Sequence, residues 1–164
     1  MATVAKRKAT QPRGVRRPGG ARTEGAAVTR YIESSALVAA VLESDPAARV
    51  SIRAKGERVT SALTFAEANR AVLRARLAGR ITAQQQRAAL LTLQLFARRC
   101  HVVSVTDTIL AQAGRPFPVE PIRTLDAIHL ATAGALTEQP AFVTIVTRDA
   151  RIRDNAFALG HPVE

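Results

Sequence analysis

Acidic residues near the ends of predicted strands are the side chains of this sequence best placed to do chemistry. Those at strand-to-helix junctions are Glu33, Glu67, Asp126 and Asp149. Two carboxylates about 4 Å apart and shielded from solvent disfavour joint ionisation, so a cluster of acids needs a positive charge within it. Mg²⁺ or Mn²⁺ would supply that charge, because both ions prefer oxygen ligands and usually retain several waters. The pattern predicts a divalent-metal site suited to cleaving a phosphodiester.

Each of these acids also has an ordinary structural interpretation. Asp149 precedes a predicted helix and could be only its N-cap, while Asp126 could be a first-turn acid that the helix dipole favours. Glu67 could pair with a nearby arginine on a helix surface, and Glu33 could simply follow a strand. The four positions taken together, rather than any one of them, favour a functional site.

The predicted positions of the acids follow from an alternation of short β-type runs and longer helical runs in the sequence. Strands are predicted at residues 29–32, 59–62, 101–104 and 142–146. Helices are predicted at about 35–44, 46–55, 65–78, 83–99, 107–114, 125–136 and 150–159, with Thr82, Thr106 and Thr124 as N-caps. This order is typical of an α/β/α sandwich, in which helices flank a mostly parallel sheet. Ligands bind at the carboxyl edge of such a sheet, where most of the acids would lie.

Composition limits the other classes of protein. A chain of 164 residues that is 47% apolar has the size of one domain with a substantial core. The single Cys100 excludes an internal disulfide framework, and no zinc-ligand spacing is present. No apolar run approaches the roughly 20 residues of a spanning helix, and no secretory signal follows the basic N-terminus. We therefore expect a cytoplasmic protein without membrane segments.

Positive charge is concentrated at the N-terminus. Residues 1–28 contain seven Lys or Arg against the single acid Glu24, so they carry +6 of the net +11, and the remaining 136 residues carry +5. This segment is rich in Gly, Pro and Thr and has no apolar periodicity, which predicts a disordered tail at 1–28 and a folded domain at 29–164. The tail could be a solvated extension ahead of a true start at Val28, or an arm attracted to nucleic acid phosphates.

Four blocks of sequence surround the acids. They read YIESSAL at 31–37, TFAEAN at 64–69, RTLDAIHLATA at 123–133 and VTRD at 146–149. In this order and spacing they resemble the PIN-domain family, in particular the VapC-type toxins of prokaryotic toxin–antitoxin modules. The resemblance spans residues 30–163. One departure is Glu33, which stands where the family usually has Asp and is one methylene longer.

The resemblance implies a PIN-like fold and hydrolysis of RNA phosphodiesters by metal-activated water. It implies that Glu33, Asp126 and Asp149 hold Mg²⁺ or Mn²⁺ and that Glu67 completes the catalytic set. Ser35 matches a family hydroxyl that forms hydrogen bonds within the site, although it could instead cap the following helix.

Further residues near the blocks have candidate roles. Thr147 is expected to support the site, and Asp154 could be an additional carboxylate or a solvated surface residue. His129 could act as a general acid, but we interpret it as a packed histidine on an apolar helix. The cations that would contact RNA, or merely balance the acids, are Arg70, Arg74, Arg123, Arg148 and Arg151.

The resemblance also implies partners and leaves alternatives. A toxin of this kind would be made beside a small antitoxin whose tail covers the site. It would form a homodimer through helices, for which residues 36–42 and 83–96 are candidates unless they belong to the core. The main alternative function is a catalytically weak or inactive PIN-like module that only binds RNA. A nuclease acting on DNA ends or flaps is a third, but the chain lacks the length that such enzymes use to clamp DNA.

Overall fold

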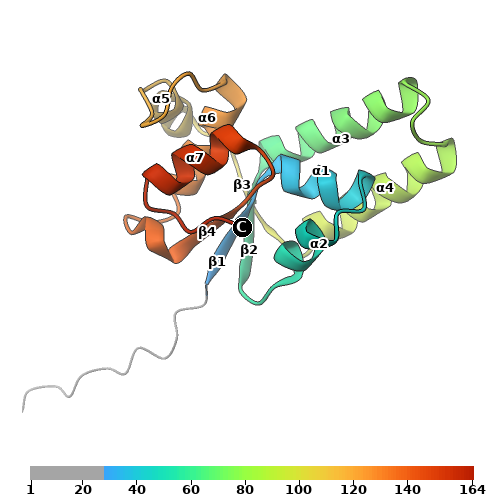
Figure 1. The fold of residues 1–164 in the computed structure, drawn as a ribbon, viewed down its shortest axis with the longest axis horizontal. Helices are drawn as coiled ribbons and strands as arrows, with labels where there is room; N and C mark the ends of the chain where they lie inside the picture. The colour runs from blue at the N-terminus through green and yellow to red at the C-terminus, as the bar shows by residue number, and fades with distance from the viewer. Residues whose placement is uncertain (1–27) are drawn as a thin grey trace, which may run out of the picture.

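A four-stranded sheet forms the centre of the molecule, in the order β3-β2-β1-β4 (Figure 1). The computed structural model describes residues 28–164, so the predicted basic tail, apart from Val28, lies outside the described residues. The strands are β1 (Thr29–Ile32), β2 (Glu57–Ser61), β3 (His101–Val103) and β4 (Val143–Val146). Each neighbouring pair of these strands is parallel, which confirms the predicted parallel sheet.

Helices cover both faces of the sheet (Figure 1). One face carries α1 (Ser34–Leu42), α2 (Pro46–Arg53), α3 (Ala62–Leu77) and α4 (Ala83–Ala97). The other side carries α5 (Asp107–Ala113), α6 (Thr124–Gly134) and α7 (Ala150–Ala158), with a short 3-10 helix, η1 (Pro140–Phe142), before β4. The fold is therefore the α/β/α sandwich that the sequence predicts. Within residues 28–164, no helix is both long and apolar enough to cross a membrane.

Strand β1 contributes to the apolar layers on both faces. Successive residues of a strand point to opposite sides, so Ile32 packs among the residues of α1 to α4, whereas Tyr31 packs against α6 and α7. Both side chains are fully buried. Burial of an isoleucine of this kind contributes about 1.5–3 kcal/mol to stability. Because Glu33 follows Ile32 directly, this buried central strand delivers it to the carboxyl edge of the sheet.

Helix α3 begins earlier than the predicted start at residue 65. It starts at Ala62, because the hydroxyl of Ser61 caps it by accepting a hydrogen bond from the Leu63 amide at 3.2 Å. The second strand accordingly ends at Ser61 rather than at residue 62. Glu67 therefore lies in the second turn of the helix and not in the first.

The other predicted helix starts have mixed outcomes. Thr82 forms the predicted capping box with Gln85, and Thr106 caps α5 as predicted. Thr124 is not an N-cap, because it is already the first helical residue and the N-cap position belongs to Arg123, which makes no side-chain capping bond. The predicted strand at 142–146 is also one residue too long, since Phe142 belongs to η1.

The last residues of the chain extend the sheet beyond β4. Val163 forms a parallel bridge with Ile145. The Ile145 amide donates to the carbonyl of Pro162 at 2.8 Å, and the Glu164 amide donates to the carbonyl of Ile145 at 3.0 Å. The sequence predicts no structure after the last helix at 150–159, which ends at Ala158.

Candidate active site

Among the described residues, Glu33 and Glu67 are the two predicted acids whose ligand atoms come together, because they and His129 place these atoms within 4.8 Å of one another. Glu33 Oε1 and Glu67 Oε2 lie 3.8 Å and 2.6 Å from the same atom, His129 Nε2. Burial raises the pKa of Asp126 above its usual range, and the negative charges of Asp149, Glu33 and Glu67 raise it further. Each of these acids therefore acts electrostatically on Asp126. We call Glu33, Glu67, Asp126 and Asp149 the acid cluster.

Glu33 is the N-cap of α1 and is almost completely buried, with 2% of its surface exposed. Its Oε1 accepts hydrogen bonds from Ser34 Oγ at 2.6 Å and from the Ser35 amide at 3.0 Å. Its Oε2 accepts from Thr147 Oγ1 at 2.8 Å and also from Ser35 Oγ. Since a carboxylate has about four lone-pair sites, these four donors occupy its acceptor capacity.

Two hydroxyls tie this acid to the loop between β4 and α7. Besides donating to Glu33, Thr147 Oγ1 accepts from the Asp149 amide at 3.0 Å, and Ser35 Oγ accepts from the Arg148 amide at 2.8 Å. Ser35 is not the helix N-cap, which was one of its two predicted roles, because Glu33 occupies that position. Both hydroxyls thus hold the first and last acids of the cluster together across the sheet.

Asp126 and Asp149 have oxygen atoms that protein donors do not saturate. Asp126 lies in the first turn of α6, and among the described residues its Oδ2 is buried without a hydrogen-bond partner. Asp149 is the N-cap of α7, and its Oδ1 accepts from the amides of Arg151 at 2.8 Å and Ile152 at 3.3 Å. Both of these bonds use Oδ1, which leaves Oδ2 available. A buried, unpartnered carboxylate oxygen is costly unless a cation or water fills the site, so this chemistry fits a hard cation.

A buried histidine joins two of the acids. The interpretation of His129 as a packed residue is correct in that only 1% of its side chain is exposed, but Nε2 also forms a 2.6 Å hydrogen bond with Glu67. Nδ1 lies 2.8 Å from the hydroxyl of Tyr31. The sequence signals were the position of His129 one helical turn after Asp126 and that of Tyr31 two residues before Glu33, which in each case favour a shared face.

The electrostatics of Glu67 differ from those of Asp126. Partial burial opposes ionisation of Glu67, but the hydrogen bond from His129, together with smaller contributions from other neighbours, outweighs that effect and lowers its pKa below the usual range. In contrast, burial of Tyr31 and the nearby charge of Glu33 raise the pKa of the phenol far above its usual value. Tyr31 therefore keeps its proton under all physiological conditions.

Asp154 and Arg148 differ from the other predicted site residues in their surroundings. Asp154 is exposed on α7. The residue beside it is buried instead, because Asn155 bonds to the backbone of Val119 at 2.9 Å and 2.8 Å. Arg148 Nε donates a hydrogen bond at 2.8 Å to Oδ2 of Asp45, which is the N-cap of α2. Both side chains are about three-quarters buried.

The remaining predicted cations stay on the surface around the site. Arg70, Arg74, Arg123 and Arg151 are all exposed. The charge of Arg74 contributes to the lowered pKa of Glu67, and that of Arg123 partly offsets the raised pKa of Asp126. These two arginines are therefore near enough to the cluster to act on it electrostatically.

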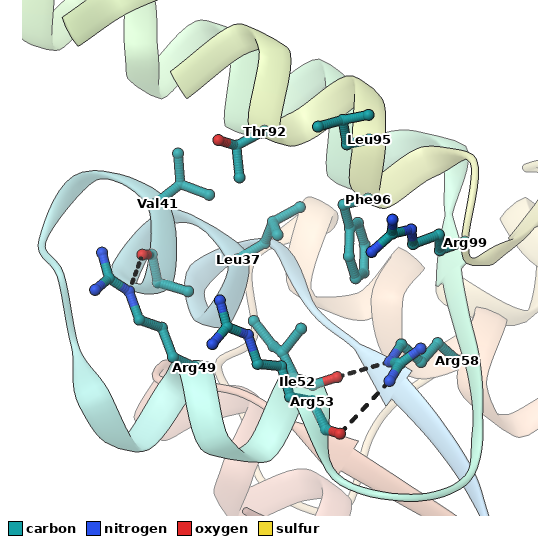
Figure 2. A pocket seen from close by; sticks show the side chains of 11 residues that line it. Leu37, Val41, Arg49, Ile52, Arg53, Arg58, Thr92, Leu95, Phe96 and Arg99 are labelled. Atoms are coloured by element: carbon teal, nitrogen blue, oxygen red, sulfur yellow. Dashed lines mark hydrogen bonds between the residues drawn. The ribbon is translucent and has the colours of Figure 1, made fainter. Parts of the chain in front are cut away.

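A separate groove of about 590 Å³ lies between α1, α2 and α4, and none of the four acids lines it (Figure 2). Its apolar lining includes Leu37, Val41, Ile52, Leu95 and Phe96, and its arginines are Arg49, Arg53, Arg58 and Arg99. Two of these arginines are held by backbone carbonyls, since Arg49 Nε donates to Ala40 at 2.9 Å and Arg58 Nε donates to Ile52 at 2.8 Å. We call this feature the arginine groove.

Comparisons with known proteins identify the family of the chain. The family model for the PIN domain matches residues 30–158. Ribonuclease VapC46 of Mycobacterium tuberculosis (strain ATCC 25618 / H37Rv) is 40% identical over 136 residues, which cover 81% of this chain and 94% of that protein. Ribonuclease VapC35 of Mycobacterium tuberculosis (strain CDC 1551 / Oshkosh) is 31% identical over 133 residues, which cover 79% of this chain and 90% of that protein. The chain therefore belongs to the PIN domain family and is a relative of the VapC ribonucleases.

Proposed function

We propose that the protein is a Mg²⁺- or Mn²⁺-dependent endoribonuclease that hydrolyses RNA phosphodiester bonds, and that it is the toxin of a type II toxin–antitoxin system acting in the cytoplasm. The observation that carries the metal dependence is the buried, unpartnered Oδ2 of Asp126, whose pKa is raised by burial and by the neighbouring acids. A bound cation would favour the ionised form of this carboxylate and would supply the missing partner. The cluster offers carboxylate oxygens rather than cysteine sulfur as ligands, which favours a hard ion.

Asp126 and Asp149 are the residues best suited to hold the ion, because each has an oxygen without a protein donor. Glu33 is also proposed as a ligand, but one of its hydroxyl donors has to rotate away to free a lone pair. Serine and threonine hydroxyls can do this without moving their oxygen atoms far. A bound divalent ion would polarise the phosphate and lower the pKa of the attacking water.

The other acid and the hydroxyls complete the site. Glu67 is proposed to accept a proton or to orient water beside the ion, since its lowered pKa keeps it ionised. Ser35 and Thr147 are proposed to hold Glu33 and the Asp149 loop in register. The exposed side chains of Arg70, Arg74, Arg123 and Arg151 are proposed to contact RNA phosphates. Arg148 is a weaker candidate, because Asp45 already occupies it.

The direct test is RNA cleavage by the purified protein. Structured RNA and single-stranded DNA are incubated with Mg²⁺, Mn²⁺ or EDTA, beside the variant Asp126→Asn. The matched control is Glu138→Gln, which removes an exposed carboxylate in the loop after α6. We expect metal-dependent cleavage of RNA that Asp126→Asn loses and Glu138→Gln keeps. Cleavage that persists unchanged in Asp126→Asn would refute the mechanism.

The alternative of a weak or inactive RNA-binding module has one observation in its favour. Glu33 already receives four hydrogen bonds, so a metal has to compete with them. This alternative predicts tight RNA binding that survives EDTA and no cleavage with any metal. The same cleavage experiment, accompanied by a binding titration, distinguishes it from the enzyme.

For the part of the antitoxin that lies outside the acid cluster we propose a segment that is both apolar and acidic. The arginine groove has an apolar floor between α1 and α4 with arginines along its edge (Figure 2). Such a surface is complementary to an amphipathic segment that carries Asp or Glu. Reversing the charge of Arg53 is expected to weaken antitoxin binding without changing RNA cleavage by the free protein. A change in RNA cleavage instead would assign the groove to RNA.

We also propose that the protein forms a homodimer. The predicted dimer helices at 36–42 and 83–96 pack against each other in the core through buried residues such as Leu37 and Leu93. Their outer residues are accessible, among them Leu91, which is 55% exposed. Sedimentation measurements on the wild type and on Leu91→Lys would test whether this surface joins two copies.

A further inference from the structure

A chain of two hydrogen bonds links Tyr31, His129 and Glu67. It begins at the hydroxyl of Tyr31 on β1, passes through both ring nitrogens of His129 on α6 and ends at Glu67 on α3. The two bonds are 2.8 Å and 2.6 Å long. Tyr31 is fully buried and His129 is 1% exposed, so water does not compete for these contacts.

The chemistry of the groups fixes the direction of the chain. An ionised carboxylate only accepts hydrogen bonds, so Glu67 requires a proton on Nε2 of His129. In the neutral imidazole Nδ1 is then an acceptor, which requires Tyr31 to donate its hydroxyl proton. The two hydrogen bonds together therefore require the neutral tautomer of His129 that carries its proton on Nε2.

We propose that Tyr31 and His129 are positioning residues, which orient the Glu67 carboxylate toward the rest of the acid cluster. This inference rests on the proposed function of the cluster. Glu67 projects from the second turn of α3 with 25% of its side chain exposed, so without a partner it would sample several rotamers. Both nitrogens of His129 are engaged, so it cannot also deliver a proton to a leaving group without releasing Glu67. The structure therefore favours positioning over the general-acid role.

The test compares two replacements of His129 that have similar size. Glutamine can place an amide N–H near the position of Nε2, whereas leucine fills the space without any donor. We expect His129→Leu to lower kcat and Mn²⁺ affinity about 10- to 100-fold, as is typical for residues behind a metal site. We expect His129→Gln to stay within a few-fold of the wild type. The KM for RNA should change little in either variant, because the exposed arginines bind the substrate.

Thermal unfolding shows whether both variants fold. Tyr31→Phe provides a milder variant that removes a single oxygen atom. A double variant shows whether His129 acts through Glu67. If it does, adding His129→Leu to Glu67→Gln costs no further Mn²⁺ affinity. Equal loss in folded His129→Leu and His129→Gln, or additive losses in the double variant, would overturn the proposal.

A spectroscopic readout tests the chain in the wild type. Nitrogen-15 NMR distinguishes the two neutral tautomers of histidine, and the His129→Gln spectrum assigns the signal among the histidines. We expect the proton on Nε2, with Nδ1 unprotonated, and a shift of the Nδ1 signal in Tyr31→Phe. A proton on Nδ1 would overturn the proposal. Because NMR and Mn²⁺ binding do not require RNA, failure of the wild type to cleave RNA would count against the proposed function alone.

Discussion

Replacing Asp126 with asparagine is expected to stabilise the metal-free protein. Asp126 Oδ2 is buried without a partner among the described residues, and burial and the charge of Asp149 raise the pKa of this acid. Asparagine keeps a polar atom at this position but removes the charge, which relieves the burial penalty and the repulsion by neighbouring acids. Because the group is partly exposed, we expect a gain on the order of 1 kcal/mol. For a domain of this size, such a gain raises Tm by roughly 2–6 °C.

A bound divalent metal should make the wild type more stable than Asp126→Asn. A ligand that binds only the folded state contributes about 2.7 kcal/mol when its concentration is 100 times its Kd. The wild type should gain this stabilisation from Mn²⁺, whereas Asp126→Asn should gain little because it has lost a charged ligand. Circular dichroism melts in EDTA and in excess Mn²⁺ measure both effects. Glu138→Gln is the control and should follow the wild type in each condition.

The pH dependence gives a second signature of the same interaction. The folded pKa of Asp126 is raised above its unfolded value. Its contribution to stability is therefore fully present below the unfolded pKa and is lost as the pH rises through the folded pKa. In EDTA, the advantage of Asp126→Asn should grow across that interval. An asparagine variant that is less stable than the wild type in EDTA, or that shows the same Mn²⁺ shift, would refute the reasoning.

Three further predictions concern the neighbours of this acid. Glu33→Ala should lower the free energy of unfolding by about 2–4 kcal/mol, because it removes the α1 cap and leaves buried hydroxyls without their acceptor. Urea unfolding measures the loss, and an equal effect from Glu33→Gln, which keeps the side-chain length, would contradict it. Glu67 has a lowered pKa, so its contribution to stability is present above the unfolded pKa and is lost as the pH falls through the folded pKa. Glu67→Gln should therefore reduce the loss of stability at low pH, which Tm values recorded across the pH range would measure. Arg148→Ala should lower Tm only slightly and less at high salt, because its ion pair with Asp45 is partly solvated. A large loss that salt leaves unchanged would show that Arg148 acts through packing instead.

The sequence by itself determined the features that depend on local patterns. The strand at Thr29–Ile32 and the Thr82 capping box follow from neighbouring residues, and both are as predicted. The placement of Asp126 and Asp149 at helix starts is also local, because first-turn and N-cap positions are set within a few residues. The parallel order of the sheet followed from the alternation of strands and helices, and the motif blocks indicated the family.

Only the tertiary structure decided which of these side chains face one another. The partners of His129 lie 98 and 62 residues away in the sequence, and Arg148 turns to a residue 103 positions away. No periodicity records such contacts, since they arise where the ends of different elements meet. The four predicted acids were thus recognisable from the sequence. The saturation of Glu33 by hydroxyls, the unpartnered oxygen of Asp126 and the support of Glu67 by a buried histidine required the packing of β1, α3, α6 and the β4–α7 loop against each other.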